Sequence, residues 1–238
     1  SEGEVATMMW TVGCVKNNFG WTDNRLMAKL TDLLLEEPLE SLNRGGRLLV
    51  RILWTLTVHK DSIDSFACRR LGQKVLHMLD IGSRQDDLST HHISTIILAG
   101  ASLHVMREEA AEQLVDFFSQ ALSILKDRIT EENLAVLELG LAASALTELY
   151  DELQYLERRQ KVSSTAADEA TRRPAQSMIM SSQLDGLLAE VRGPAESLLS
   201  SGLLKMSQLD IESCSSLVKI VVTVLPRAAL STDFVEAA

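Results

Sequence analysis

The segment LLVRILWTLT, residues 48–57, decides the fold that this sequence predicts, because apolar side chains cover most sides of the helix it would form. Only Arg44, Arg47 and Arg51, at i, i+3 and i+7, leave a polar stripe along that helix. A surface helix needs one apolar stripe, whereas a helix that is apolar on nearly all sides must be enclosed by neighbours. The segment therefore indicates an inner helix of a stacked array.

Similar blocks recur along the chain: EVATMMWTVG at 4–13, HISTIILAGA at 92–101, NLAVLELGLA at 133–142 and, less clearly, SLVKIVVTVL at 216–225. The equivalent place in the first four blocks is held by Trp10, Trp54, Leu98 and Leu139, at spacings of 44, 44 and 41 residues. A period in the low forties is that of a repeated helix pair, which buries its apolar face only by stacking. We expect an all-α protein, a right-handed α-solenoid of about five stacked helix pairs.

Helix boundaries follow from caps and breakers such as Gly20, Asp23 and Pro38. We expect four helix-pair repeats over residues 1–160, a flexible linker or loop over 161–175, and degenerate C-terminal repeats with a cap over 176–238. The linker prediction rests on KVSSTAADEATRR, residues 161–173, which has no apolar period. The predicted helices are Glu4–Asn17, Asn24–Glu36, Arg44–His59, Ser62–Asp80, His91–Val105, Glu108–Lys126, Thr130–Ala145, Glu148–Gln160, Ser182–Arg192, Ala195–Met206 and Ile211–Leu225.

Charge is unevenly distributed along the chain. The net charge of −10 disfavours a general polyanion binder, because affinity for phosphates comes from clustered lysines and arginines. Between residues 41 and 80, however, seven basic residues face three acidic ones, whereas 108–157 hold twelve acidic residues and two basic ones. A solvated helix face explains such a pattern, and so does a surface that binds an acidic partner or RNA. The candidate partner- or RNA-binding residues are Arg44, Arg47, Arg51, Arg69, Arg70 and Lys74.

No pattern of catalytic or metal-binding chemistry is visible. The chain lacks GxxxxGK[ST], GxSxG, HExxH and CxxC, and no Ser, His and Asp arrangement stands out. The adjacent His91 and His92 point about 100° apart on a helix and cannot chelate one ion as an i, i+4 pair does. Trp10 and Trp54 are interpreted as core residues, because Leu holds the equivalent positions. We therefore expect no enzyme activity, no catalytic residues, no metal, no cofactor and no small-molecule substrate.

Cysteine usage and hydropathy bear on the compartment. Cys14, Cys68 and Cys214 lie far apart, which favours reduced, buried thiols in an intracellular reducing compartment. No segment reaches the ~18–20 apolar residues that span a bilayer, so no membrane association is expected. The chain begins at Ser1, so a targeting peptide removed earlier would leave no trace.

The blocks EVATMMWTVG and LLVRILWTLT, each followed by a second helix of the LMAKLTDLLLEE kind, resemble helical repeats of organellar proteins. The pattern is similar to octotricopeptide and heptatricopeptide repeats and to FAST-kinase-like proteins, and armadillo or HEAT repeats fit the period nearly as well. It also resembles the armadillo/HEAT-like accessory subunits of kinetoplastid mitochondrial RNA-editing complexes. The resemblance, which covers about residues 4–160, implies RNA processing in a mitochondrion or other organelle.

The repeats depart from direct RNA readers, which place polar residues regularly on one face above a basic groove. We therefore expect a non-catalytic scaffold that binds other protein subunits of a mitochondrial RNA-processing or RNA-editing complex. The alternative is a protein that binds RNA directly through the basic ridge of the second repeat.

Overall fold

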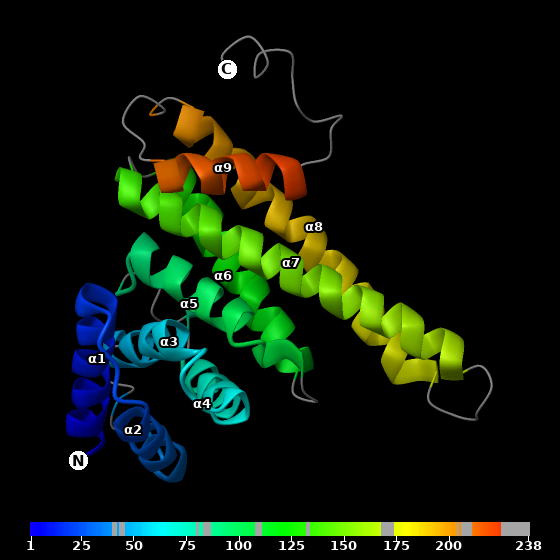
Figure 1. Ribbon diagram of the computed structural model, residues 1–238. Coiled ribbons are helices and arrows are strands. Elements are labelled where there is room, and N and C mark those ends of the chain that lie inside the picture. Colours follow the sequence, from blue (N-terminus) through cyan, green and yellow to red (C-terminus); the bar gives the residue numbers. More distant parts are fainter. Residues whose placement is uncertain are drawn as a thin grey trace. The chain divides into compact units, whose positions relative to one another are not determined.

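The computed structural model describes residues 1–39, 42, 46–79, 81–82, 87–107, 111–131, 134–167, 174–203, 205 and 211–224. These residues form helices joined by turns and short connections, and none of them lies in a β-strand (Figure 1). The expectation of an all-α fold is confirmed. The chain divides into two compact units, Ser1–Phe117 and Phe118–Ala238.

Before α6, the described residues of the first unit form five short α-helices arranged in two sets. Its helices are α1 (Glu2–Phe19), α2 (Asn24–Glu36), α3 (Arg47–His59), α4 (Ser65–Met78) and α5 (Thr90–Ser102), followed by the 3₁₀ helix η3 (Val105–Arg107). α3 packs against both α1 and α5, while α2 packs against α4 (Figure 1). The three helices α1, α3 and α5 thus pack in sequence, and α2 packs beside α4.

The core of this unit is centred on α3, as the apolar circumference of residues 48–57 predicts. Leu49, Ile52, Leu53 and Leu56 are fully buried there. Burying a Leu or Ile side chain contributes about 1.5–3 kcal/mol, so this one helix supplies a large share of the apolar stabilisation. The expectation of an enclosed inner helix is confirmed.

Local capping chemistry separates these helices. Gly20 adopts φ 68° at the end of α1, a conformation that favours glycine, and its N–H donates to the Lys16 carbonyl. The Asp23 carboxylate accepts from the N–H groups of Arg25 and Leu26 at the start of α2. Asp64 and Ser89 cap α4 and α5 in the same manner.

The second unit is built around one long helix. The boundary between the units falls inside α6 (Ala111–Glu131), after which come α7 (Val136–Ala167), α8 (Pro174–Leu203) and α9 (Ile211–Thr223). α7 is 32 residues long and packs against both α8 and α9. Its buried face includes Leu139, Leu146, Leu149 and Leu153.

Three predicted breaks in this half of the chain were wrong. α7 runs without interruption through the break predicted between Ala145 and Glu148, because the helix-forming, fully buried Leu146 continues its apolar face. It also covers 161–167, the first half of the predicted loop, where Ser and Thr lower helix propensity without ending a helix and Ala favours one. Residues 168–173 lie outside the described residues.

α8 corrects the third prediction, since it passes through Gly193 and Pro194 without ending. A proline inside a helix removes one hydrogen bond at a cost of about 3 kcal/mol. Pro194, Ala195 and Leu198 are nevertheless buried, and burial of this face offsets that cost. The division of the chain also differs from the prediction. The boundary between the two compact units follows Phe117, whereas the predicted first domain ended at residue 160.

A candidate binding pocket on the first helices

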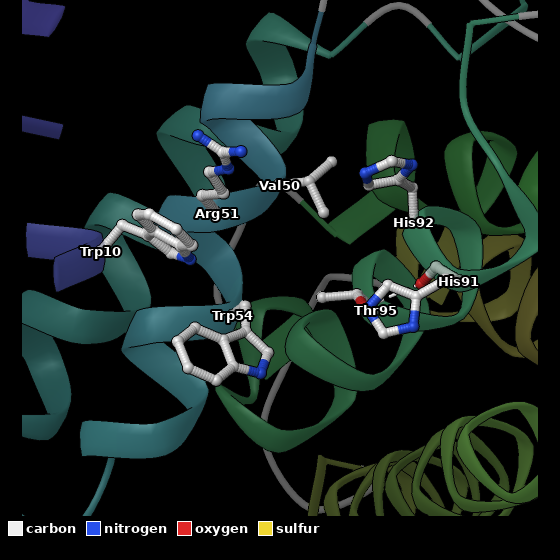
Figure 2. Close-up of a pocket in the computed structure, with 7 residues that line it drawn as sticks. All are labelled: Trp10, Val50, Arg51, Trp54, His91, His92 and Thr95. Atoms are coloured by element: carbon white, nitrogen blue, oxygen red, sulfur yellow. Dashed lines mark hydrogen bonds between the residues drawn. The ribbon is translucent and has the colours of Figure 1, made fainter. Parts of the chain in front are cut away.

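The first unit has a surface pocket of about 190 Å³ between α1, α3 and α5. Figure 2 shows Trp10 beside Arg51, Trp54 one turn further along α3, and two histidines projecting from α5. The pocket therefore joins residues from three helices that are adjacent in space and far apart in sequence. It is lined by Trp10, Val50, Arg51, Trp54, His91, His92 and Thr95.

Trp10 and Trp54 are half-buried and line this pocket. Sequence reasoning assigned both to the core, and the structure corrects that assignment. Leu98, the equivalent residue of the third block, is also half-buried, while Leu139 of the fourth block is fully buried. The equivalent positions of the first three blocks thus lie at the edge of the packed layer, where a large indole buries part of its surface and exposes the rest.

Arg51 is exposed and its guanidinium carbon lies 4.4 Å from the centroid of the Trp10 ring. At this distance a cation over an indole face gains about 0.5–1 kcal/mol at an exposed site. Arg47 lies one turn earlier on the same helix and is also exposed. Among the described residues, neither guanidinium group forms an ion pair or a hydrogen bond.

His92 is held by the N-terminal cap of α5. Its Nδ1 accepts from the Ser89 backbone N–H at 3.2 Å and lies 2.9 Å from Ser89 Oγ. Burial, and then the positive charges of His91, Arg47 and Arg51, lower the pKa of His92 below its usual value. The imidazole is therefore neutral at pH 7, with its proton on Nε2.

The predicted basic residues do not form one cluster. Arg47 and Arg51 share the pocket side of α3, whereas Lys74 on α4 donates to the carbonyls of Leu34 and Leu35 at 3.1 and 2.7 Å and also to that of Glu37. Lys74 thus caps the C-terminus of α2, where a cation is stabilising. Its ammonium group therefore has a structural role, whereas the sequence predicted that Lys74 binds a partner or RNA.

The remaining candidates lie on α4 or outside the described residues. The Arg70 guanidinium is 5.6 Å from the Phe66 ring centroid, and both side chains are exposed. Arg69 is half-buried on the same helix. Arg44 lies in the part of the chain that the structure leaves undescribed.

The sequence did not predict that tryptophan and histidine side chains belong to the site. Arg47, Arg51 and Trp54, spaced i, i+4 and i+7, fall on one helix stripe, and Trp54 continues the arginine pattern by one turn. That stripe was the signal for an exposed tryptophan. The proximity of Trp10, His91 and His92 depends on how α1 and α5 pack against α3, which no local pattern encodes.

All three cysteines carry free thiols. Cys68 is buried, and burial raises the pKa of its thiol to about 11. Cys14 and Cys214 are half-buried. Only Cys68 therefore fits the expectation of a buried thiol. Within the described ranges, no three His, Cys, Asp or Glu side chains gather as metal ligands would.

A second pocket, of about 400 Å³, lies in the second unit between α6 and α8. It is lined by Ser119, Leu122, Ser123, Lys126, Ala189, Glu190, Gly193 and Pro194. One lysine and one glutamate supply its charge, so it lacks the concentration of cationic and aromatic groups found on the first helices.

Comparison with known proteins identifies no relative: no protein-family model, curated protein or solved structure matches the chain. Among the helices described, none is long and apolar enough to cross a bilayer.

Proposed function

We propose that this chain is a non-catalytic helical-repeat scaffold that binds other protein subunits through the face formed by α1, α3 and α5. The packing of α3 between α1 and α5, with α2 against α4, supports a right-handed, armadillo/HEAT-like α-solenoid over the first unit. Such arrays present the outer surface of one row of helices as a continuous binding face.

The observation that carries this proposal is the pocket itself. Trp10, Trp54 and Arg51 are three large side chains of the types most enriched at the energetic centres of protein interfaces, and they lie together at one surface. Two half-exposed indoles beside an arginine offer apolar contact area together with directional hydrogen bonding. A partner protein covering them would remove this apolar surface from water.

We propose that this scaffold belongs to a mitochondrial RNA-processing or RNA-editing assembly, a proposal that the resemblance of its repeat blocks to organellar repeat proteins supports. Its free cysteines suit an intracellular reducing compartment. Within such an assembly, the chain would hold protein subunits together and perform no chemistry of its own.

Direct RNA binding is the second candidate, favoured by Arg47 and Arg51 beside Trp54. Arginines neutralise phosphates and an exposed indole stacks on bases. Two observations weigh against this candidate. Lys74 already caps α2, and the chain carries a net charge of −10. The basic ridge therefore offers fewer cations to RNA phosphates than the sequence predicted.

Affinity purification of the full chain from its native cells, with and without nuclease, separates these functions. The scaffold function predicts a set of partner proteins that persists after nuclease treatment. Filter binding to single-stranded RNA at two salt concentrations tests the alternative, which predicts a steep loss of affinity with salt. Loss of every protein partner after nuclease treatment would contradict the scaffold function.

A further inference from the structure

The size of the pocket on α1, α3 and α5 limits what it can receive. Its volume of about 190 Å³ is below the roughly 300–1,000 Å³ of sites that enclose drug-sized ligands and cofactors. It corresponds to about six water molecules at roughly 30 Å³ each. A space of this size suits one side chain of a partner protein better than a nucleotide or a cofactor.

The charges around the pocket favour the binding of an anion. Arg51 lines it and Arg47 lies one turn away, while none of the described residues that line it is acidic. The positive charges of Arg47 and Arg51 both act on His92, which shows that the two guanidinium groups share this region electrostatically. A carboxylate placed here would gain attraction from both arginines.

Hydrogen-bond donors are also in place for a carboxylate. The Arg51 side chain rests on the Trp10 ring at 4.4 Å, so part of its conformational freedom is lost before binding. Its planar fork of N–H groups matches the two oxygens of a carboxylate. Because Nδ1 of His92 is engaged by Ser89, the Nε2–H of the same ring remains as a further donor.

The pocket also has an apolar wall. Trp54 is half-buried there, next to the buried Val50, so part of its indole is open to a ligand. An apolar side chain beside the bound acid would cover this indole. The ligand best matched to the lining is therefore an acidic residue with an apolar neighbour.

RNA fits this lining less well. The guanidinium of Arg51 already occupies one face of Trp10, which removes that face as a base-stacking platform. Arg47 and Arg51 are two permanent cations, whereas proteins that bind nucleic acids through their phosphates commonly make about 6–10 such contacts. A single carboxylate needs only one bidentate arginine.

We propose that this pocket receives one aspartate or glutamate side chain from an extended segment of a partner protein, with an apolar neighbour of that residue against Trp54. This inference rests on the scaffold function proposed above and specifies the chemistry of its partner. The segment is acidic and apolar, and Arg51 is the residue that recognises its carboxylate.

The test is a selection of phage-displayed random peptides on the full chain at low salt. Recovered peptides are expected to be enriched in Asp or Glu next to an apolar residue. The best peptide is then synthesised, and its affinity is measured by fluorescence anisotropy. Arg51→Gln should weaken binding about tenfold or more. Replacing the peptide's acid by its amide should weaken it similarly, and the two changes together should cost little more than either alone.

Two further variants guard against an effect on folding. Arg51→Lys keeps the charge and loses the bidentate fork, so it should bind with intermediate affinity. Arg70→Gln is the matched control, because Arg70 also rests on an aromatic ring but lies on α4 outside the pocket. It should bind the peptide as the unmodified chain does.

Several results would overturn the inference. They are a set of recovered peptides without acidic enrichment, equal effects of Arg51→Gln and Arg70→Gln, or binding of oligouridylate that is lost in Arg51→Gln. If protein partners still survive nuclease treatment in any of these cases, the scaffold function stands and only the acidic partner is wrong. Loss of those partners would instead contradict the scaffold function itself.

Discussion

The two compact units contain helices of different lengths because their sequences place helix breakers differently. In the first unit, helices of 13–18 residues end at residues such as Gly20 and Pro38, and a capping residue such as Asp23 starts the next helix. In the second unit, α7 and α8 are 32 and 30 residues long. From Leu141 to Arg173 the sequence contains neither glycine nor proline. A recurring apolar block is therefore followed by a short helix and a turn only where helix breakers accompany it.

The largest expected effect is on the enclosed helix of the first unit. Leu53 is fully buried on α3, so Leu53→Ala should lower the free energy of unfolding by about 2–5 kcal/mol through lost burial and the cavity left behind. All three tryptophans lie in this unit, so denaturant unfolding followed by tryptophan fluorescence reports on it. Leu33→Ala is the control, because that side chain is 45% exposed. A loss below about 1 kcal/mol for Leu53→Ala would show that α3 is not enclosed.

Close packing of helices should also differ between the units. A Cβ at Gly13 would lie 2.9 Å from two atoms of Thr55 and 3.0 Å from the Trp54 ring, and neither side chain yields easily. Gly13→Ala should therefore destabilise by about 1–2 kcal/mol, since overpacking exceeds the gain in helix propensity.

Gly202 in α8 provides the counterpart in the second unit. A Cβ there would meet the tip of Leu217, a flexible side chain, at 2.7 Å. Gly202→Ala should be within about 0.5 kcal/mol of neutral by circular dichroism, because the leucine can rotate away while the helix gains propensity. Equal losses for the two glycines would contradict the close approach of α1 to α3.

Acidification should destabilise the first unit, which holds all five histidines. His59 is fully buried, and burial, then the charge of Lys16, lowers its pKa below its usual value. The folded state thus resists protonation, so stability is fully present above about pH 6.5 and falls as the unfolded chain takes up the proton below it. The loss is at most about 1.4 kcal/mol per pH unit for this group.

Unfolding followed by tryptophan fluorescence at pH 7.5 and 5.5 measures this loss. His59→Gln removes the titrating group and should reduce the difference between the two pH values. An unchanged difference in that variant would assign the pH dependence to other residues.

The smallest effect concerns two cations of α4. Lys74→Met removes the donor to the Leu34 and Leu35 carbonyls and should lower the stability of the first unit by about 1 kcal/mol. Arg70→Gln, four residues earlier and exposed, should change it by less than about 0.5 kcal/mol. Equal values from chemical denaturation would refute the capping role of Lys74.

The fold could be predicted where local sequence patterns, such as apolar periodicity and helix caps, determine it. The apolar circumference of 48–57 indicated an enclosed helix, and the Gly20 and Asp23 caps placed the first connection correctly. The predicted breaks at Ala145, Lys161 and Gly193 were wrong. At Ala145 and Gly193, burial of one helix face outweighs the weak local signals and the cost of a proline. At Lys161, serine and threonine lower helix propensity by too little to end a helix.

The site was predictable only in its basic half. Arg47 and Arg51 stood out as a polar stripe on an apolar helix, and Arg51 lines the pocket while Arg47 lies one turn earlier on α3. Lys74 was chosen by the same charge count, yet its ammonium reaches the end of α2, which is a matter of tertiary geometry. Trp10 and His92 joined the site through helix packing between residues about forty to eighty positions apart.

The most direct test of the proposed function compares two aromatic residues of the first unit, the half-buried Trp54 and the exposed Phe66. Trp54 lines the pocket on α3, whereas Phe66, 55% exposed, lies on α4 outside it. The full chain carrying Trp54→Ala or Phe66→Ala is purified from native cells after nuclease treatment, and the recovered partners are quantified. The scaffold account predicts that Trp54→Ala lowers partner recovery at least tenfold, as loss of an interface hot spot would, while Phe66→Ala leaves it unchanged. Equal recovery with both variants would contradict the assignment of partner binding to the face of α1, α3 and α5.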